Sequence, residues 1–498
     1  MYSQRPREIL LRWLLALGCF ALLINFFSPS WGAFRLWSRV PEMSGMLEVR
    51  RGVAVLEQVA HPGAPVADEL HRAIQWRLFF PVIGHVLNLP PSVFFALADL
   101  GCVLVLGYLV TLLRKQQFCW SDTALATLML GAASWFFTSM GWLGYFDSWF
   151  VLALLLVAFA EPRWVVWLAC LLAPWVDERF VAAGPLALLC RWLHRDASTP
   201  AVRFDWRREA SAPGALLAVF LVVRLGVLSG STAAGATVGS YLSARDYLDA
   251  PLSRIALGVW EGLRMAWIFV VIGVVGLWPR RGRALILSST VLGLVVVGVS
   301  TAQDYSRAMT MVFPVAVLGL LLPWGAWKSW QPLALRIGAA VALLLPAHHV
   351  MNDLVNPIFD LQHELTVLRT PPPVAMPELY ELHAIHEMER GEFTQADADL
   401  ALAIKLAENP ASPAKQRGIL AANQGHWADA LRYFSLMAEH DTENPDAWFM
   451  CAQANLALGR APEARSSMEH ALGLAPKEWN TRQDVARFLV RLQAAAGK

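Results

Sequence analysis

Long apolar runs separated by short polar segments dominate the first 347 residues of the chain. Several runs approach the roughly 20 apolar residues that a helix needs to cross a bilayer upright. The runs between residues 147 and 192 are shorter, which is typical of broken or re-entrant helices packed inside a protein. We expect about eleven membrane segments, at residues 9–28, 91–113, 121–140, 147–160, 164–176, 180–192, 211–229, 257–278, 284–300, 308–325 and 334–347.

The last third of the chain has a different, repeating pattern. The stretches "GEFTQADADLALAIKL", "GHWADALRYFSLMAEH" and "GRAPEARSSMEHALGL" begin 34 residues apart, at Gly391, Gly425 and Gly459. Small and large apolar residues recur at fixed offsets from these glycines, namely Ala396, Ala430 and Ala464, then Leu400, Phe434 and Met468. This period and these residue types resemble the tetratricopeptide repeat, in which pairs of helices stack.

The apolar runs and this resemblance together predict an all-α protein in two parts. A polytopic membrane domain covers residues 1–347, and a linker with the stiff sequence "RTPPPVAMP" covers residues 348–376. A helical solenoid follows at 377–498, with repeats at about 377–410, 411–444 and 445–478 and a capping helix at about 479–495. Such solenoids bind partner proteins on a concave face, so we expect a protein partner for this domain.

Composition agrees with a membrane protein. The chain is 56% hydrophobic and 16% charged, against about 25% charged residues in ordinary globular domains. A formal net charge of +2 gives no reason to expect a nucleic-acid partner. The six cysteines form no CxxC, so neither a disulfide framework nor a zinc site is indicated. His348, His349 and Asp353 have a spacing compatible with a metal site but lack a strong third ligand, and we expect no cofactor, with a divalent metal left as an alternative.

The positions of the basic residues predict the orientation in the membrane. With Arg5 and Arg7 in the cytoplasm, alternating crossings place every short basic cluster inside: 114–115, 163, 191–208, 279–283 and 328. Eleven crossings then place the repeat domain outside. We therefore expect a multi-pass protein of a bacterial inner membrane, with a cytoplasmic N-terminus and a periplasmic repeat domain.

Charged residues gather at the predicted outer helix ends or within membrane segments, where an unpaired charge costs several kcal/mol. The candidate bases are Asp147, Asp177 and Glu178. The candidate substrate-binding residues are Arg77, Arg179, Arg224, Glu261, Arg264, Asp304 and Arg307. These side chains form a site on one side of the membrane or, in the simpler structural interpretation, ion pairs that tie short helices together.

Many segments, a long amphipathic first outer loop and acidic residues at outer helix ends resemble the membrane glycosyltransferases of the GT-C class. The resemblance implies transfer of a sugar from a polyprenyl-phosphate donor to an acceptor on the periplasmic face. A carboxylate would act as general base and arginines would hold the lipid phosphate. The partners would be membrane lipids, a lipid-linked sugar and the protein that the repeats recruit.

Two other classes of function are compatible with the sequence. One is an O-antigen polymerase or ligase-like protein, which also combines many membrane segments with outer arginines. The other is a non-enzymatic transporter or a scaffold for envelope polysaccharide assembly. The sequence has no GxxxxGK[ST], HExxH or GxSxG motif that would indicate a different enzyme class.

Overall fold

The computed structural model describes residues 6–39, 44, 46–64, 74–198, 204–224, 250–322, 327–369, 377–476 and 479, 481–482, 485–486 and 489. The chain divides into two compact units. Unit 1 comprises Met1–Arg35 and Met46–Arg369, and unit 2 comprises Leu36–Gly45 and Thr370–Lys498. Both are helical, as predicted, apart from one short hairpin in the described part of unit 1.

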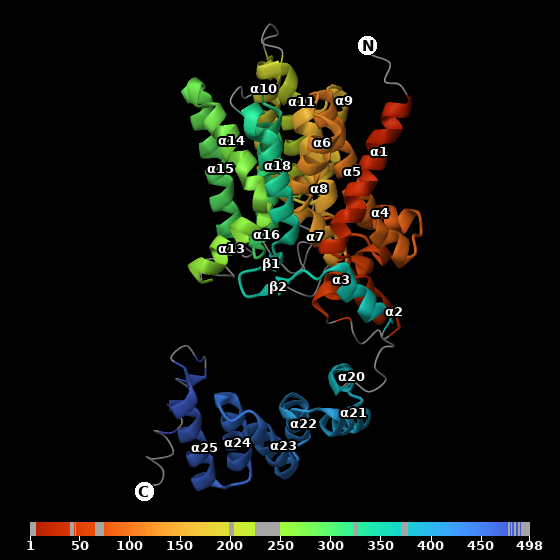
Figure 1. Cartoon of the computed structure of the whole chain (residues 1–498). Coiled ribbons are helices and arrows are strands. Elements are labelled where there is room, and N and C mark those ends of the chain that lie inside the picture. The colour runs from red at the N-terminus through yellow and green to blue at the C-terminus, as the bar shows by residue number, and fades with distance from the viewer. Residues whose placement is uncertain are drawn as a thin grey trace. The chain divides into compact units, whose positions relative to one another are not determined.

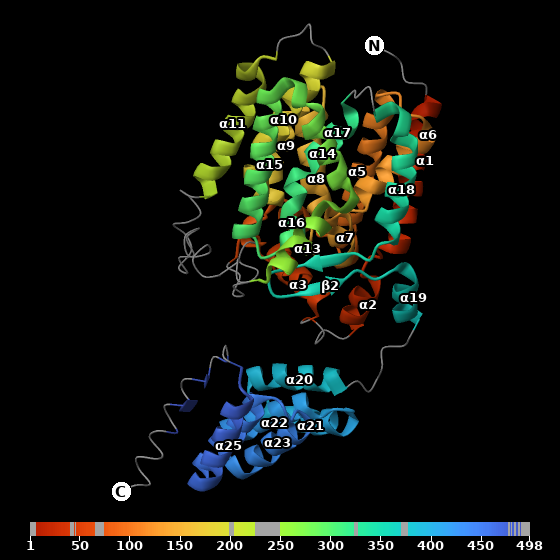
Figure 2. The same ribbon diagram turned by 60° about the vertical axis from the view of Figure 1, so that its left-hand side comes forward.

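Unit 1 is a bundle of helices that run mostly along one common direction (Figures 1 and 2). Its first half contains α1 Pro6–Phe26, α3 Leu47–Ala60, α4 Phe79–Val86, α5 Pro91–Lys115, α6 Trp120–Gly131, α7 Ser134–Gly141, α8 Asp147–Phe159 and α9 Arg163–Val176. Helix α2, Trp31–Arg39, crosses the boundary between the units. The second half contains α10 Arg179–Ser198, α11 Trp206–Val222, α13 Leu252–Leu263, η4 Arg264–Ala266, α14 Trp267–Gly276, η5 Trp278–Arg280, α15 Arg281–Thr301, α16 Tyr305–Ala308, η6 Met309–Val312, α17 Phe313–Leu321 and α18 Trp327–Leu344.

Four stretches in the described residues are long and apolar enough to cross a membrane, or five if the bent pair α6–α7 is one span. This is fewer than the roughly eleven segments that the apolar runs predict, several of which are shorter than about 20 residues. Parts of the segments predicted at 211–229 and 308–325 also lie outside the described residues. The difference arises because several runs form short or bent helices: α6 and α7 meet at 63°, and α8 and α9 have 13 and 14 residues. Large apolar side chains are nevertheless exposed along α1, α9 and α15, as a lipid-facing surface requires.

Glycine lets the short helices of unit 1 pack closely. A Cβ atom at Gly319 of α17 would lie 1.9 Å from the carbonyl oxygen of Phe269 in α14. Gly273 of α14 lies against the same point, since a Cβ there would be 3.1 Å from the Cα of Gly319. Small residues at helix crossings are typical of membrane proteins, in which backbone approach replaces the hydrophobic effect as a source of stability.

Unit 1 extends past residue 347, where we placed the end of the membrane domain. Strands β1 His348–Val350 and β2 Val355–Pro357 pair antiparallel, with His349 opposite Asn356. Helix α19, Leu361–Arg369, follows and is anchored to the start of the chain, because Glu364 accepts a hydrogen bond from the amide of Gly32 at 2.9 Å. Much of the predicted linker is therefore structured, and its proline-rich part lies outside the described residues.

Unit 2 contains three consecutive helix pairs: α20 Pro377–Arg390 with α21 Phe393–Leu406, α22 Ala411–Asn423 with α23 Trp427–His440, and α24 Pro445–Ala457 with α25 Ala461–Leu474. Gly391, Gly425 and Gly459 lie in the turn within each pair and have φ of +79°, +77° and +74°. Only glycine adopts this left-handed conformation without strain, which explains why it recurs every 34 residues.

The core of unit 2 contains the residues that the repeat pattern singled out. Ala396, Ala430 and Ala464 are fully buried, as is Leu400, and Phe434 and Met468 are nearly so. Beyond α25 the described residues of the predicted capping helix include Val485 and Leu489, which pack against Met468 and Ala452. The rest of that predicted helix lies largely outside the described residues.

We expect residues 377–498 to fold when expressed alone, with a helical circular dichroism spectrum and cooperative melting. Gly418→Ala should lower the melting temperature, because a Cβ there would lie 2.4 Å from the ring of Phe434. Gly473→Ala is the matched control, since no atom lies within 4 Å of its added Cβ and alanine favours a helix. Aggregation of the fragment, or equal melting of the two variants, would contradict this prediction.

Candidate functional site

Polar side chains from distant segments meet at one end of unit 1. The segments are the start of α8, the α9–α10 junction, α16 and Arg77, which lies two residues before α4. Figures 1 and 2 show α7, α13 and α16 with the β1–β2 hairpin at this end of the bundle. The site lies at helix ends because each short helix begins or ends there with a charged residue.

Asp147 is at the centre of this network and is 1% exposed. Arg307 donates from Nε and Nη2 to its carboxylate, at 3.1 and 2.8 Å from Oδ2. Arg179 donates from Nη2 to the other oxygen, Oδ1. The Nη1 of Arg179 also donates to the carbonyl of Arg307 at 2.6 Å. The two arginines thus close one polar centre among α8, α10 and α16, and both carboxylate oxygens of Asp147 are occupied.

Asp177 and Glu178 continue the network toward its more exposed edge. Asp177 accepts from Nε and Nη2 of Arg179 at 2.9 and 2.8 Å. Arg77 forms a bidentate pair with Glu178, with both N–O distances 2.9 Å, and its Nη1 lies 3.2 Å from Asp177. Glu178 is the most exposed carboxylate of the network, with 26% of its side chain accessible. The first predicted outer loop therefore reaches the site through Arg77.

The acids between α9 and α10 remain ionised. Burial by itself would raise the pKa of Asp177, but the guanidinium groups of Arg179 and Arg77 outweigh it and hold that pKa well below its usual range. Burial likewise acts to raise the pKa of Glu178, but the positive charge of Arg77 outweighs it and lowers that pKa. Both groups therefore act as acceptors and as counter-charges at physiological pH.

His349 joins the site although its sequence pattern suggested only a weak metal motif. Its Nε2 lies 3.1 Å from Asp304, which caps α16 by accepting from the amide of Arg307. The imidazole packs on Trp142, with ring centroids 4.4 Å apart, and is 1% exposed. No simple signal marks this residue, because the hairpin that carries it reaches the site only through tertiary packing.

Arg51 of α3 is a second residue that the sequence did not single out. It is 7% exposed, donates to the carbonyl of Gly144 at 3.2 Å and stacks on Tyr145 at 4.2 Å. Among the described residues no carboxylate forms an ion pair with it. Burial and the neighbouring charge of Arg77 lower the pKa of Arg51 to about 10. The site thus contains a buried cation that no carboxylate of the described residues neutralises directly.

A small cavity lies beside Arg51, Arg77 and Asp177. Its volume is about 10 Å³, which is room for about one water molecule. Aromatic and aliphatic residues from α3, α4 and the start of α8 complete its wall, including Phe80 and Phe146, whose rings stack 4.0 Å apart. The cavity as it stands has no room for a ligand larger than a water molecule.

The other three predicted site residues lie beside this network or apart from it. Arg224 packs on Trp76, next to the position of Arg77, with 5.8 Å from its guanidinium carbon to the ring centroid. Arg264 pairs with Glu261 at 3.2 Å and donates to three carbonyl groups at the end of α18, of Ala342, Leu345 and Pro346. Arg264 therefore terminates α18 and serves the packing of a broken helix.

The predicted inner loops meet at the opposite end of unit 1. Glu209 binds Arg163, Arg191 and Arg195 at 2.7 to 2.9 Å. Asp196 pairs with Arg283, and Lys115 pairs with Glu161. The structure therefore gathers the basic clusters of four separate loops on one side, away from the network around Asp147.

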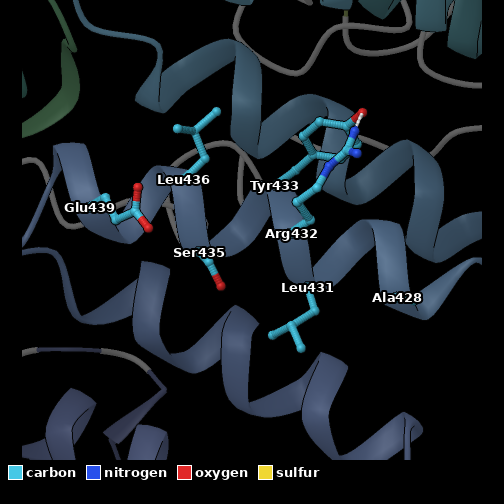
Figure 3. Close-up of a pocket in the computed structure, with 7 residues that line it drawn as sticks. All are labelled: Ala428, Leu431, Arg432, Tyr433, Ser435, Leu436 and Glu439. Carbon is cyan, nitrogen blue, oxygen red and sulfur yellow. Dashed lines mark hydrogen bonds between the residues drawn. The ribbon is translucent and has the colours of Figure 1, made fainter.

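Unit 2 has a shallow hollow along α23, with a volume of about 550 Å³ (Figure 3). Its described lining combines apolar side chains such as Leu431 and Leu436 with Ser435, Glu439 and Arg432, which donates a hydrogen bond to the hydroxyl of Tyr433. A mixed surface of this kind suits a protein segment better than a small apolar ligand.

Comparison with known proteins supports the assignment of unit 2. A family model described as a tetratricopeptide repeat matches residues 421–483, which cover most of the second and third helix pairs. Tetratricopeptide repeats generally mediate protein–protein interaction, which supports a protein partner for unit 2. No curated protein matches the chain.

We expect Asp147→Asn to destabilise unit 1 by about 3–5 kcal/mol, because it leaves two buried arginines without their shared counter-charge. Glu161→Gln, in an exposed pair with Lys115, should cost at most about 1 kcal/mol. Thermal unfolding of the detergent-solubilised protein measures both variants. Equal melting temperatures for Asp147→Asn and wild type would show that the network does not hold the helix ends together.

Proposed function

We propose that unit 1 is a membrane glycosyltransferase that transfers a sugar from a polyprenyl-phosphate donor to an acceptor at the outer face of the membrane. Arg51 is the observation that carries this proposal. A buried guanidinium group without a carboxylate partner is unfavourable alone, and an anion that reached it would restore neutrality. A lipid phosphate is the anion best placed to arrive at a helix end in the membrane interface.

The surroundings of Arg51 support an anion rather than a further carboxylate. Arg77, Arg179 and Arg307 bring three positive charges, and Asp147, Asp177, Glu178 and Asp304 bring four negative ones. These carboxylates are occupied by the other arginines and by His349, and none of them pairs with Arg51. The aromatic wall beside the small cavity, with Phe80 and Phe146, is apolar enough to border a lipid chain.

Glu178 is the general base in this proposal. Arg77 is its only hydrogen-bond donor among the described residues, and a donor phosphate competes for the same guanidinium group. Once Arg77 turns to the phosphate, Glu178 is free to take the proton of the acceptor hydroxyl. The hydroxyl oxygen then bonds to the anomeric carbon, the bond from that carbon to the phosphate oxygen breaks, and polyprenyl phosphate leaves with its charge held by arginines.

Asp147 and Asp177 have supporting roles in this scheme. Asp147 holds Arg179 and Arg307 in place, and Asp177 sets the position of Arg179 relative to Arg77. Loop helices α3 and α4 would cover the donor, because Arg51 and Arg77 both belong to the segment between α1 and α5. Unit 2 would recruit a protein partner to the same face.

A scaffold for envelope assembly is the second candidate function. One observation favours it: each carboxylate in the Asp147 network already has an arginine partner, and the cavity has room for about one water molecule. In this alternative the network only joins helix ends, and unit 2 alone carries the activity by binding proteins.

We further propose about eleven crossings, with the N-terminus in the cytoplasm and unit 2 in the periplasm of a bacterial cell. The convergence of Arg163, Arg191 and Arg283 at the end opposite Asp147 supports this orientation. A cysteine placed at Ser198 should be shielded from a membrane-impermeant thiol reagent in intact cells. One placed at Ser412 should be labelled once the outer membrane is permeable. Exposed Cys119 is replaced first, and labelling at Ser198 but not at Ser412 would reverse the orientation.

Glu178→Gln should abolish the glycan product while the protein is expressed at the normal level. Loss of a general base lowers a rate by about 10²- to 10⁴-fold, and the neutral amide keeps the shape of the side chain. Mass spectrometry of lipid-linked and envelope glycans measures the product. Glu57→Gln, at an exposed position of α3, is the matched control. Normal product from Glu178→Gln, or product that falls only with protein abundance, would favour the scaffold.

A further inference from the structure

The first helix pair of unit 2 carries a histidine and two carboxylates where the other pairs have different side chains. His383 and Glu387 lie one turn apart on α20, and Asp399 lies on α21. One ligand atom from each of the three lies within 4.8 Å of the others. The Nδ1 of His383 hydrogen bonds to Asp399 and is 3.7 Å from Oε1 of Glu387.

Packing does not require these three residues. The 34-residue period places Arg417, Ala421 and Tyr433 at the corresponding positions of the second pair, and Cys451, Asn455 and Ser467 at those of the third. The core between α20 and α21 is made by other residues, chiefly Ala384, Ala396 and Leu400. A buried carboxylate in this interface is therefore a feature of the first pair that stacking alone does not explain.

Glu387 is the residue that points to a ligand. It is 5% exposed, and its Oε2 has no hydrogen-bond partner among the described residues. A buried carboxylate oxygen without a hydrogen-bond partner costs free energy and therefore destabilises the folded repeat. A cation bound between Glu387, His383 and Asp399 would satisfy it.

We infer that His383, Glu387 and Asp399 form a binding site for a divalent transition-metal ion, of which Zn²⁺ fits the donor set best. One imidazole nitrogen and two carboxylate oxygens are ordinary zinc ligands, at about 2.0–2.2 Å from the ion. Both His383 and Asp399 are partly exposed, with 40% and 24% of their side chains accessible, so an ion can enter. Three protein ligands leave a fourth position for water.

The site would act as a clasp within the first repeat. Its ligands come from both helices of the pair, so a bound ion would join α20 to α21 independently of their apolar contacts. Binding also stabilises the folded state over the unfolded one by mass action. This inference concerns unit 2 alone and does not depend on the chemistry proposed for unit 1.

Titration of the tag-free, full-length protein in detergent with Zn²⁺ or Co²⁺ tests this site. Calorimetry should show one strong equivalent of Zn²⁺, and Co²⁺ should give a visible absorption band. Glu387→Gln and Asp399→Asn should each weaken binding at least tenfold and remove the band. Asp397→Asn is the matched control, because Asp397 lies on α21 together with Asp399 but pairs with Arg417.

The melting temperature of unit 2 provides the second readout. Zn²⁺ should raise the melting temperature of unit 2 in the wild type and in Asp397→Asn but not in Glu387→Gln. A helical circular dichroism spectrum of Glu387→Gln would show that this variant folds. The inference fails if the wild type binds no stoichiometric Zn²⁺. It also fails if Glu387→Gln and Asp399→Asn bind the ion as tightly as the wild type, since the ligands would then lie elsewhere.

Discussion

Mutual neutralisation of buried arginines and carboxylates is the interaction on which unit 1 depends. Burying a single ion in this interior would cost several kcal/mol, and removal of its partner leaves that cost uncompensated. Asp147 is stable because Arg179 and Arg307 both reach it, and these arginines are fixed by Asp177 and by the backbone of α16. The ends of the short helices α8 and α16 and the start of α10 are thereby joined at one point.

Buried charges are neutralised at both ends of the bundle, but the two ends differ in how the charges are arranged. At one end three arginines share Glu209, and this end collects the basic loops. At the other end charges of both signs are also buried, and no carboxylate in the described part of the chain pairs with Arg51. In our proposal the first arrangement faces the cytoplasm, and the second has a charge that a ligand can satisfy.

The sequence predicted features that depend on local pattern. Glycine at 391, 425 and 459 marks the left-handed turn within each helix pair, so period and residue type together predicted unit 2. Charges next to apolar runs predicted the helix ends that carry Asp147, Asp177 and Arg307, which the structure brings together.

Features that depend on tertiary packing were not predictable in this way. Arg51 follows another arginine in an amphipathic helix, where charged residues normally face water, and nothing local shows that it is buried. His349 reaches Asp304 through a hairpin in a segment expected to be a linker. Arg264 is a predicted site residue that instead ends α18, since its role depends on a helix break that periodicity does not reveal.

The central claim is that the buried network of unit 1 recognises a lipid phosphate through Arg51. Native mass spectrometry of the detergent-solubilised protein, with a polyprenyl phosphate and with the matching polyprenol, tests it most directly. Our account predicts that the wild type retains the phosphate but not the alcohol, and that Arg51→Gln loses the phosphate. Arg50→Gln, at the exposed neighbouring position, should retain it. Equal retention of phosphate and alcohol, or of phosphate by Arg51→Gln and Arg50→Gln, would contradict the account.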